Sequence, residues 1–170
     1  MKITSTERLE LRRFTLDDVT FIVQLLNSSG WLQFIGDRGV RTTKDAEAYL
    51  EGGPIKSYAV NGFGLWLTAL KESSTPIGMC GMLKREGLDE IELGFALLPE
   101  YIRRGYAYEM AQATVEYAKT TFSLLRIAAI TKVDNNASIR LLNNLNFKFE
   151  RTVNLHGSEQ MLNLYAADLR

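Results

Sequence analysis

Polar and apolar side chains alternate near the start of the chain, over residues 8–12, as they do in a strand with one buried face. The period then lengthens to that of an amphipathic helix, for which Thr15 is a suitable N-cap. Gly52 and Gly53 are expected to break a later helical stretch, and Pro54 suits the first position of the helix that follows. This half therefore predicts a strand at 8–12, helices at 15–27, 43–50 and 54–61, and a loop at 31–41.

The second half of the chain contains most of the predicted strands. Residues 91–98 are apolar enough for a strand that is buried on both faces of a sheet. Residues 105–122 carry the longest helical pattern, and Asn135 or Asn136 can cap the next helix. His156, which precedes Gly157, is interpreted as a solvated residue at a hairpin tip. The predicted strands are 65–71, 77–84, 91–98, 126–133, 147–155 and 160–169.

The order of these elements indicates the fold class. One strand and a group of short helices come first, followed by three strands, a helix, a strand, a helix and two strands. Successive strands without a helix between them argue against a doubly wound parallel sheet. We therefore expect an α/β domain of the α+β type, in which helices flank a mixed central sheet of about seven strands. Because no stretch resembles a linker, residues 1–170 are expected to form a single domain.

Composition and charge narrow the classes of function. The chain has 20 Lys and Arg against 20 Asp and Glu, which argues against nucleic-acid binding by bulk attraction to phosphate but leaves a local basic patch open. With Cys80 as the one cysteine and His156 as the one histidine, neither an internal disulfide nor a His–His metal site can form, and we expect no metal. No apolar run approaches the roughly 20 residues of a membrane span, and the start lacks a signal peptide, so we expect a cytoplasmic protein.

The most informative stretch joins the end of a predicted strand to the start of the longest helix. Arg103, Arg104 and Gly105 stand at that start, where a helix offers unpaired N–H groups and the positive end of its dipole. Gly105 permits an oxygen-rich ligand to come close to the backbone. The pattern therefore predicts a phosphate or pyrophosphate site, without the signature of a Walker loop or of a dinucleotide fingerprint. Taken alone, such a motif is more often an ordinary helix start with solvated arginines.

The same stretch resembles motif A of the GNAT N-acetyltransferase superfamily, Q/R-x-x-G-x-G/A, which holds the pyrophosphate of acetyl-coenzyme A. The six positions are Ile102-Arg103-Arg104-Gly105-Tyr106-Ala107, so an isoleucine replaces the first polar residue. The continuation through Tyr108-Glu109-Met110 resembles the Gly-Tyr-Ala-Thr-Glu-Ala of the RimJ/RimL-like branch. Further stretches that resemble this branch are Thr6-Glu7-Arg8-Leu9 to Arg12-Arg13-Phe14, Glu90-Ile91-Glu92-Leu93-Gly94-Phe95, Asn135-Asn136-Ala137-Ser138 and Leu145-Asn146-Phe147.

The resemblance implies the fold of that superfamily and acyl transfer from acetyl-CoA, as co-substrate, to an amine. Backbone groups of 96–98 would align the pantetheine arm like an added strand, and Asn135 would hydrogen-bond that arm or brace the strand ends. Asn146 replaces the glycine of the Leu-Gly-Phe motif, which is a mild change at a left-handed helix exit. The residues implied in binding acetyl-CoA are Ala96, Leu97, Leu98, Arg103, Arg104, Gly105, Tyr106, Ala107, Tyr108 and Asn135.

Glu92 is the candidate general base. It is a carboxylate within an otherwise apolar strand, where desolvation raises the pKa toward a useful value. A glutamate on this strand often has that role in the superfamily. The alternative is a structural glutamate that accepts hydrogen bonds or faces solvent from a half-exposed strand. Glu90 has the same parity but lies nearer the start of the strand.

Ser138 is the candidate general acid for the leaving thiolate. Many members of the superfamily use a tyrosine on the helix after the fifth strand, but the matching position here is Leu142, which has no proton to donate. Ser138 belongs to the matching Asn-x-x-Ser, and its alternative role is capping or first-turn bonding. Protonation by solvent is also open.

The acceptor pocket is expected beneath the early helices and the final hairpin. Its candidate wall residues are aromatic, namely Trp31, Phe34, Tyr58, Phe63 and Trp66, although each of them also suits core packing. Asp37 and Arg38 are weaker candidates for recognising charge on the acceptor. The sequence leaves the acceptor open between a peptide N-terminus, a polyamine and an amino acid.

The function predicted from these motifs is N-acetylation of a primary amine by direct transfer in a ternary complex. We expect no nucleic-acid or membrane partner, and a monomer or a homodimer. One alternative is a non-catalytic acyl-CoA-binding or sensing module of the same fold, which the leucine at position 142 keeps open. A second alternative, an interaction domain without any ligand of this kind, fits the motifs poorly.

Overall fold

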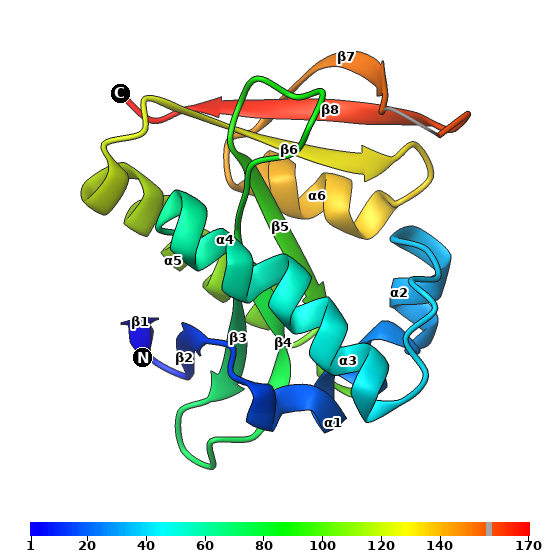
Figure 1. Cartoon of the computed structure of the whole chain (residues 1–170). Coiled ribbons are helices and arrows are strands. Elements are labelled where there is room, and N and C mark those ends of the chain that lie inside the picture. Colours follow the sequence, from blue (N-terminus) through cyan, green and yellow to red (C-terminus); the bar gives the residue numbers. More distant parts are fainter. Residues whose placement is uncertain (156–157) are drawn as a thin grey trace.

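The computed structural model of the chain describes residues 1–155 and 158–170, and one eight-stranded sheet organises it (Figure 1). The strands are β1 (Lys2–Ser5), β2 (Leu9–Arg13), β3 (Leu65–Leu70), β4 (Pro76–Leu83), β5 (Glu92–Leu97), β6 (Arg126–Lys132), β7 (Lys148–Asn154) and β8 (Met161–Asp168). Their order across the sheet is β1-β2-β3-β4-β5-β6-β8-β7. Among the strand pairs of the described residues, β5 with β6 is parallel and the others are antiparallel, so the sheet is mixed, as predicted.

The strand that the sequence analysis missed is β1, which pairs with β2 at one edge of the sheet. It has only four residues, and its register shifts between Lys2 and Thr4. A strand this short offers too few positions for an alternating pattern to stand out. The expected count of about seven strands therefore becomes eight.

Six α-helices accompany the sheet within the described part of the chain. They are α1 (Val19–Leu26), α2 (Ser29–Phe34), α3 (Thr43–Leu50), α4 (Lys56–Asn61), α5 (Tyr106–Phe122) and α6 (Asn136–Asn144). Thr15 caps the 3-10 turn that leads into α1, as predicted, and Thr42 caps α3 in the same way. Gly62 ends α4 with a φ of 78°, and Asn135 caps α6.

Two predictions about the early helices are wrong. The expected loop at 31–41 begins with part of α2, because Trp31 is buried and anchors that helix in the core. Gly52 and Gly53 do not break the chain's helical course, since a π turn over Glu51–Ile55 joins α3 to α4. The wide turn accommodates Pro54, which has no N–H to donate to the helix ladder.

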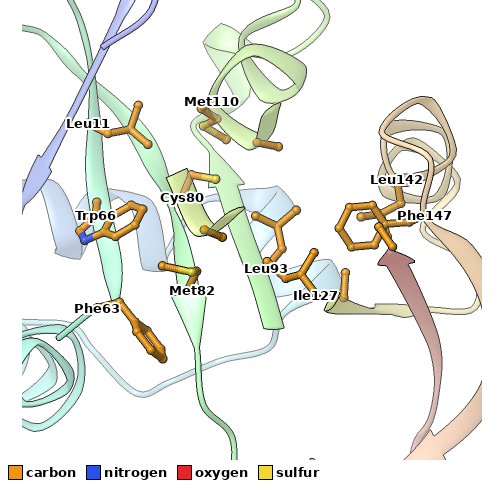
Figure 2. Packing of buried hydrophobic residues seen from close by; sticks show 14 of the residues in the cluster. Leu11, Phe63, Trp66, Cys80, Met82, Leu93, Met110, Ile127, Leu142 and Phe147 are labelled. Carbon is orange, nitrogen blue, oxygen red and sulfur yellow. The ribbon is translucent and has the colours of Figure 1, made fainter. Parts of the chain in front are cut away.

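Two hydrophobic clusters cover the two faces of the sheet. Trp66 and Cys80 belong to the cluster that α5 closes, whereas their chain neighbours Leu67 and Met79 belong to the cluster of α1 and α3. This division follows from the strand period of two, which sends successive side chains to opposite faces. Figure 2 shows Met110 of α5 above Cys80 in the first cluster. Both faces of the central strands are therefore covered by helices.

Strands β5 and β6 separate soon after they begin. Their register holds one pair, Glu92 with Ala128, and the N–H of Ala128 donates to Ile91 O at 2.9 Å. Beyond that point the two strands diverge (Figure 1). Residues 94–97 of β5 are consequently half-buried, so the prediction that this strand is buried on both faces is wrong for its second half.

The terminal hairpin of β7 and β8 forms as predicted, with Asn154 opposite Met161 as the last pair. The predicted tip, His156 with Gly157, lies outside the described residues. None of the helices in the described ranges is long and apolar enough to span a bilayer.

Candidate active site

The separation of β5 and β6 opens into a cleft of about 960 Å³. Its walls come from α2, from the continuous helical stretch of α3 and α4, from β3, from β4 and the residues after it, from β5, from the end of β6, from the start of α6 and from the terminal hairpin. In Figure 1, α2 faces the end of β6 and the start of α6. Segments that are far apart in sequence therefore converge on the place where the sheet is split.

Glu92 lines this cleft at the point where β5 and β6 are still paired. Its side chain is buried, and Arg85 holds both carboxylate oxygens, with Nε 2.9 Å from Oε2 and Nη2 3.1 Å from Oε1. Burial raises the pKa of Glu92, and the nearby Arg85 guanidinium opposes this effect without cancelling it. Each carboxylate oxygen has two lone pairs, so one on each oxygen remains for another donor.

The edge of β5 that faces β6 carries unpaired backbone groups. Ile91 O accepts from Ala128 of β6, whereas the N–H of Leu98 donates to Ile77 O at 2.8 Å on the β4 side. Because backbone groups alternate in direction along a strand, those of Phe95 and Leu97, beyond the paired part, point toward the gap. Of the three predicted residues Ala96, Leu97 and Leu98, only Leu97 presents its backbone there, while Ala96 lines the cleft and pairs with Met79.

Asn135 and Ser138 lie on the opposite wall of the cleft, at the start of α6. The side chain of Asn135 accepts a hydrogen bond from the Ser138 N–H at 3.2 Å, so Asn135 is the helix cap. Leu142, at the position where a tyrosine was considered, is buried in the core and packs in the region of Phe147 (Figure 2). Ser138 therefore remains the candidate proton donor on this helix, because it lines the cleft and its hydroxyl carries a proton that can be transferred.

The predicted anion site forms a tight turn ahead of α5. Arg103 and Gly105 have φ values of 60° and 82°, and the side chains of Arg103 and Arg104 are exposed. Gly105 is the N-cap of α5 and provides no side-chain cap, which leaves the first N–H groups of the helix available. Tyr106 and Ala107 are half-buried against the core, and Tyr108 is exposed.

The segment that leads into β2, residues 6–8, contacts this turn and is called the N-terminal arm below. Arg8 donates from Nη1 to Arg104 O at 3.0 Å, and its guanidinium lies 4.4 Å from the ring centroid of Tyr106. Nε of Arg8 also donates to Glu109 Oε2 at 2.7 Å, and Thr6 bonds the other oxygen of Glu109. Burial alone would raise the pKa of Glu109, but the hydrogen bonds from Thr6 and Arg8 lower it. Arg8 and Thr6 thus hold this region from outside, through Arg104 O in the turn and through the Glu109 carboxylate in the first turn of α5.

The aromatic residues proposed for the acceptor wall divide into two groups. Trp31 and Phe34 of α2 line the cleft, as does Arg38 in the loop that follows. Trp66 is buried on the other face, edge-on to Tyr117 at 5.4 Å between ring centroids, and Phe63 packs on Phe122 in the same layer. The Tyr58 hydroxyl is used by Phe14 N–H and Leu65 O, and Asp37 pairs with Arg41. Four of the proposed residues therefore do not line the cleft, namely Trp66, Phe63, Tyr58 and Asp37.

Sequence reasoning missed the arginine that holds Glu92. The available signal was the hairpin between 77–84 and 91–98, since pairing of Leu83 with Glu92 brings Arg85 beside that carboxylate. It also missed the contact between Arg8 and Glu109, although both residues stand in motifs that were singled out. That contact joins positions 101 residues apart, and no local pattern signals it.

Comparison with known proteins adds a family and a fold. Residues 8–148 match the family model of the acetyltransferase (GNAT) domain. The chain is similar to the uncharacterized N-acetyltransferase YnaD of Bacillus subtilis (strain 168), with 29% identity over 153 residues that cover 88% of this chain and 84% of that protein.

Solved structures agree with this match. The GNAT-family acetyltransferase from Bacillus anthracis superposes with a TM-score of 0.80 and 25% identity, covering 99% of both chains. RimL, a ribosomal L7/L12 alpha-N-protein acetyltransferase in complex with coenzyme A, gives a TM-score of 0.80 at 19% identity, covering 99% of this chain and 98% of that one. The likeness to RimL concerns the fold.

Proposed function

The chain belongs to the GNAT acetyltransferase family, and from this premise we propose that it transfers an acetyl group from acetyl-CoA directly to a primary amine in a ternary complex. The observation that carries the proposal is the open edge of β5, which begins beside the buried carboxylate of Glu92 and continues toward the turn at Gly105. An extended amide-bearing arm can add to such an edge as a strand does. One end of this arm would then lie beside the carboxylate of Glu92, and the other beside the anion site at the turn of Gly105.

The residues present suit two parts of acetyl-CoA, the pyrophosphate and the pantetheine arm. The free N–H groups at the start of α5, with the exposed Arg103 and Arg104, suit a pyrophosphate. The backbone of Phe95 and Leu97 suits the pantetheine amides, with Asn135 on the facing wall. When bound, acetyl-CoA supplies an activated thioester, and the remaining steps depend on the protein side chains and backbone.

Glu92 would accept the proton that the acceptor amine must lose. An amine of the lysine type titrates near pH 10.4, so at neutral pH it is an ammonium ion without a lone pair. The raised pKa of Glu92 makes it a stronger base than an exposed glutamate, and Arg85 fixes its orientation. A water molecule between Glu92 and the amine would suffice to relay the proton.

The other two requirements are a donor for the carbonyl oxygen and a proton for the leaving sulfur. A backbone N–H on the open edge of β5 would stabilise the negative charge that develops on the oxygen. As the carbon–nitrogen bond forms, the carbon–sulfur bond breaks and the attacking nitrogen releases its second proton to solvent. The leaving thiolate takes a proton from solvent, or from Ser138, which then regains a proton from solvent. The position of Ser138 supports this role, because Ser138 lines the same cleft as Glu92.

A second candidate function is a non-catalytic acyl-CoA-binding module. It is favoured by Leu142, which is fully buried where many members of the superfamily carry a tyrosine. Such a module would bind acetyl-CoA without releasing thiol in the presence of any amine. Release of the free thiol of CoA therefore separates the two functions.

Glu92→Gln tests the proposed mechanism. Glutamine is nearly isosteric and still accepts a hydrogen bond from Arg85, but it cannot take up a proton at neutral pH. We expect acetyl-CoA binding to persist and kcat to fall by about 10²–10⁴-fold, the usual contribution of general-base catalysis. The rate of the variant should recover in part as pH rises, because the amine then deprotonates unaided.

The measurement is a pair of pH–rate profiles with one accepted amine, alongside calorimetric titration with acetyl-CoA. Glu90→Gln is the matched control, because Glu90 pairs with Arg126 and does not line the cleft. Parallel profiles for the native protein and Glu92→Gln would assign Glu92 a structural role.

A further inference from the structure

Cationic side chains gather in the cleft although the chain as a whole is neutral. The sequence balances 20 basic against 20 acidic residues, yet the lining contains Arg38, Lys56, Lys84, Arg85 and Lys132 and, as its acidic member, Glu92. Arg85 and Glu92 neutralise each other in their ion pair. The other four cations therefore give the cleft a net positive charge.

These four cations come from four different parts of the fold. Arg38 follows α2, Lys56 begins α4, Lys84 follows β4 and Lys132 ends β6. Across the described ranges, none of them lies within 4.0 Å of a carboxylate, and the Lys132 ammonium donates to the neutral Gln33 carbonyl at 2.5 Å. Tertiary packing thus collects unpaired positive charge at one place.

The pyrophosphate of acetyl-CoA does not account for this charge. The turn proposed to hold it, 102–108, contributes no residue to the lining of the cleft. The 3′-phosphate of acetyl-CoA sits on the ribose, on the far side of the pyrophosphate from the pantetheine arm, and the pantetheine arm and the acetyl group are uncharged. The free cations therefore face the part of the cleft left for the acceptor.

We infer that the acceptor is a primary amine on a molecule that also carries a carboxylate, and not a polyamine. The inference rests on the proposed function and narrows its acceptor. A carboxylate would gain attraction from Lys56, Lys84 and Arg38, whereas a polyamine would meet like charge. A volume of about 960 Å³ lies at the upper end of the roughly 300–1,000 Å³ typical of ligand pockets, which leaves room for a short acidic segment beside the acyl arm.

The same field assists the chemistry. A positive environment disfavours the ammonium form of the acceptor and lowers the pKa of its amine. The carboxylate of the acceptor would hold the molecule in place while its amine approaches Glu92 in the neutral form. Attraction and activation therefore follow from one arrangement of charges.

Matched acceptors test the inference directly. The probes are the tripeptide amides Ser-Glu-Glu-NH₂ and Ser-Gln-Gln-NH₂, the small amines β-alanine and β-alaninamide, and spermidine, each assayed by release of the CoA thiol. We expect about tenfold lower KM for each acidic member than for its neutral partner, with similar kcat, because several weak exposed charges act together. The advantage should shrink as salt is raised, since exposed charges are screened.

The preference should also depend on the cleft cations. The double variant Lys56→Ala, Lys84→Ala should bring the KM values of the acidic and neutral members together. Lys119→Ala, an exposed cation of α5 that does not line the cleft, should leave the preference as it is. A larger KM advantage of the acidic member within the tripeptide pair would indicate a carboxylate of a peptide. A larger advantage within the small-amine pair would indicate the carboxylate of a free amino acid.

The outcomes separate the inference from the function on which it rests. Turnover of neutral and acidic members with equal KM, or a better rate with spermidine, would overturn the inference and leave the acetyltransferase assignment intact. Absence of thiol release with every amine, while acetyl-CoA still binds, would instead favour the non-catalytic module, and the inference would fail with the proposed function.

Discussion

At the scale of single residues, the pairing of Glu92 with Arg85 decides how the site responds to pH. Burial raises the pKa of the carboxyl and Arg85 opposes that rise, so the free enzyme should lose kcat/KM as pH falls through the pKa of Glu92. Arg85 is itself partly solvated, with a side chain 35% exposed, whereas Glu92 is 4% exposed. The negative charge of Glu92 is therefore stabilised mainly by Arg85, whereas the positive charge of Arg85 is also stabilised by solvent.

Removing the arginine should shift that dependence in a definite direction. In Arg85→Met the opposing charge is gone, the pKa of Glu92 rises further, and the acidic limb of the pH–rate profile should move to higher pH. The free energy of unfolding of the variant should also depend on this pKa. A folded-state pKa above the unfolded value favours the protonated folded form, so the variant should lose stability as pH rises from the ordinary pKa of a glutamate through the folded one.

Urea unfolding of Arg85→Met across pH, with the native protein and Glu92→Gln in parallel, measures this. The double variant Arg85→Met, Glu92→Gln should lose the additional pH dependence that Arg85→Met shows relative to the native protein, because the group responsible for it is absent. A variant stability that rises with pH over that range would contradict the assignment.

At the scale of elements, the exit of α6 is set by Asn146. Its φ of 65° places it in the left-handed region, as the Leu-Asn-Phe motif predicted, and Phe147 N–H closes back on Leu142 O at 2.9 Å. Asn146→Gly should be neutral or slightly stabilising, because glycine adopts this conformation without the strain of a Cβ. Chemical denaturation checks it, and a loss above about 1 kcal/mol would mean that the asparagine side chain contributes a contact of its own.

The link between the N-terminal arm and the start of α5 carries a second expectation at this scale. Arg8→Ala removes the bonds to Arg104 O and Glu109 and the contact with the Tyr106 ring, which should loosen the turn proposed to bind pyrophosphate. We expect about tenfold weaker binding of acetyl-CoA, equivalent to about 1.4 kcal/mol, with kcat at saturation little changed.

The matched ligand is S-acetylpantetheine, which has no pyrophosphate. Its binding should be the same in Arg8→Ala and in the native protein if the arm acts through the turn. Arg151→Ala on β7 controls for the loss of an exposed arginine. Equal weakening for both ligands would indicate a general loss of structure.

At the scale of the whole molecule, acetyl-CoA should join the two sides of the split sheet and stabilise the fold. Ligand at a hundred times its Kd adds about 2.7 kcal/mol to the free energy of unfolding. For a chain of this size that corresponds to a rise in Tm of roughly 5–10 °C. Differential scanning calorimetry at increasing acetyl-CoA measures the shift.

Gly105→Val should abolish that shift while the protein still folds. A Cβ at this position would lie 3.2 Å from the Arg8 guanidinium, and a branched residue is strained at a φ of 82°. A native shift in Tm for this variant would place the anion site elsewhere. An unshifted Tm for the native protein would count against acetyl-CoA itself.

The sequence by itself determined most of the local structure, because caps, periods and turns depend on neighbouring residues. Thr15 and Asn135 begin helices where the pattern predicted, and Gly105 has a positive φ, which glycine adopts without strain. Where local signals were weak or misleading, the fold overrode them. Burial of Trp31 made a helix from an expected loop, and a π turn carried the chain through Gly52 and Gly53.

Only the tertiary structure decided what the site contains. The split between β5 and β6 arises from long-range strand pairing, which ends after Glu92 and leaves half of a strand that looked fully buried open to a ligand. The same long-range contacts bring Arg85 to Glu92 and Arg8 to Glu109, and they send Trp66 to the core while Trp31 lines the cleft. A local pattern indicates which face of an element is apolar, but which elements that face meets depends on the packing of the whole chain.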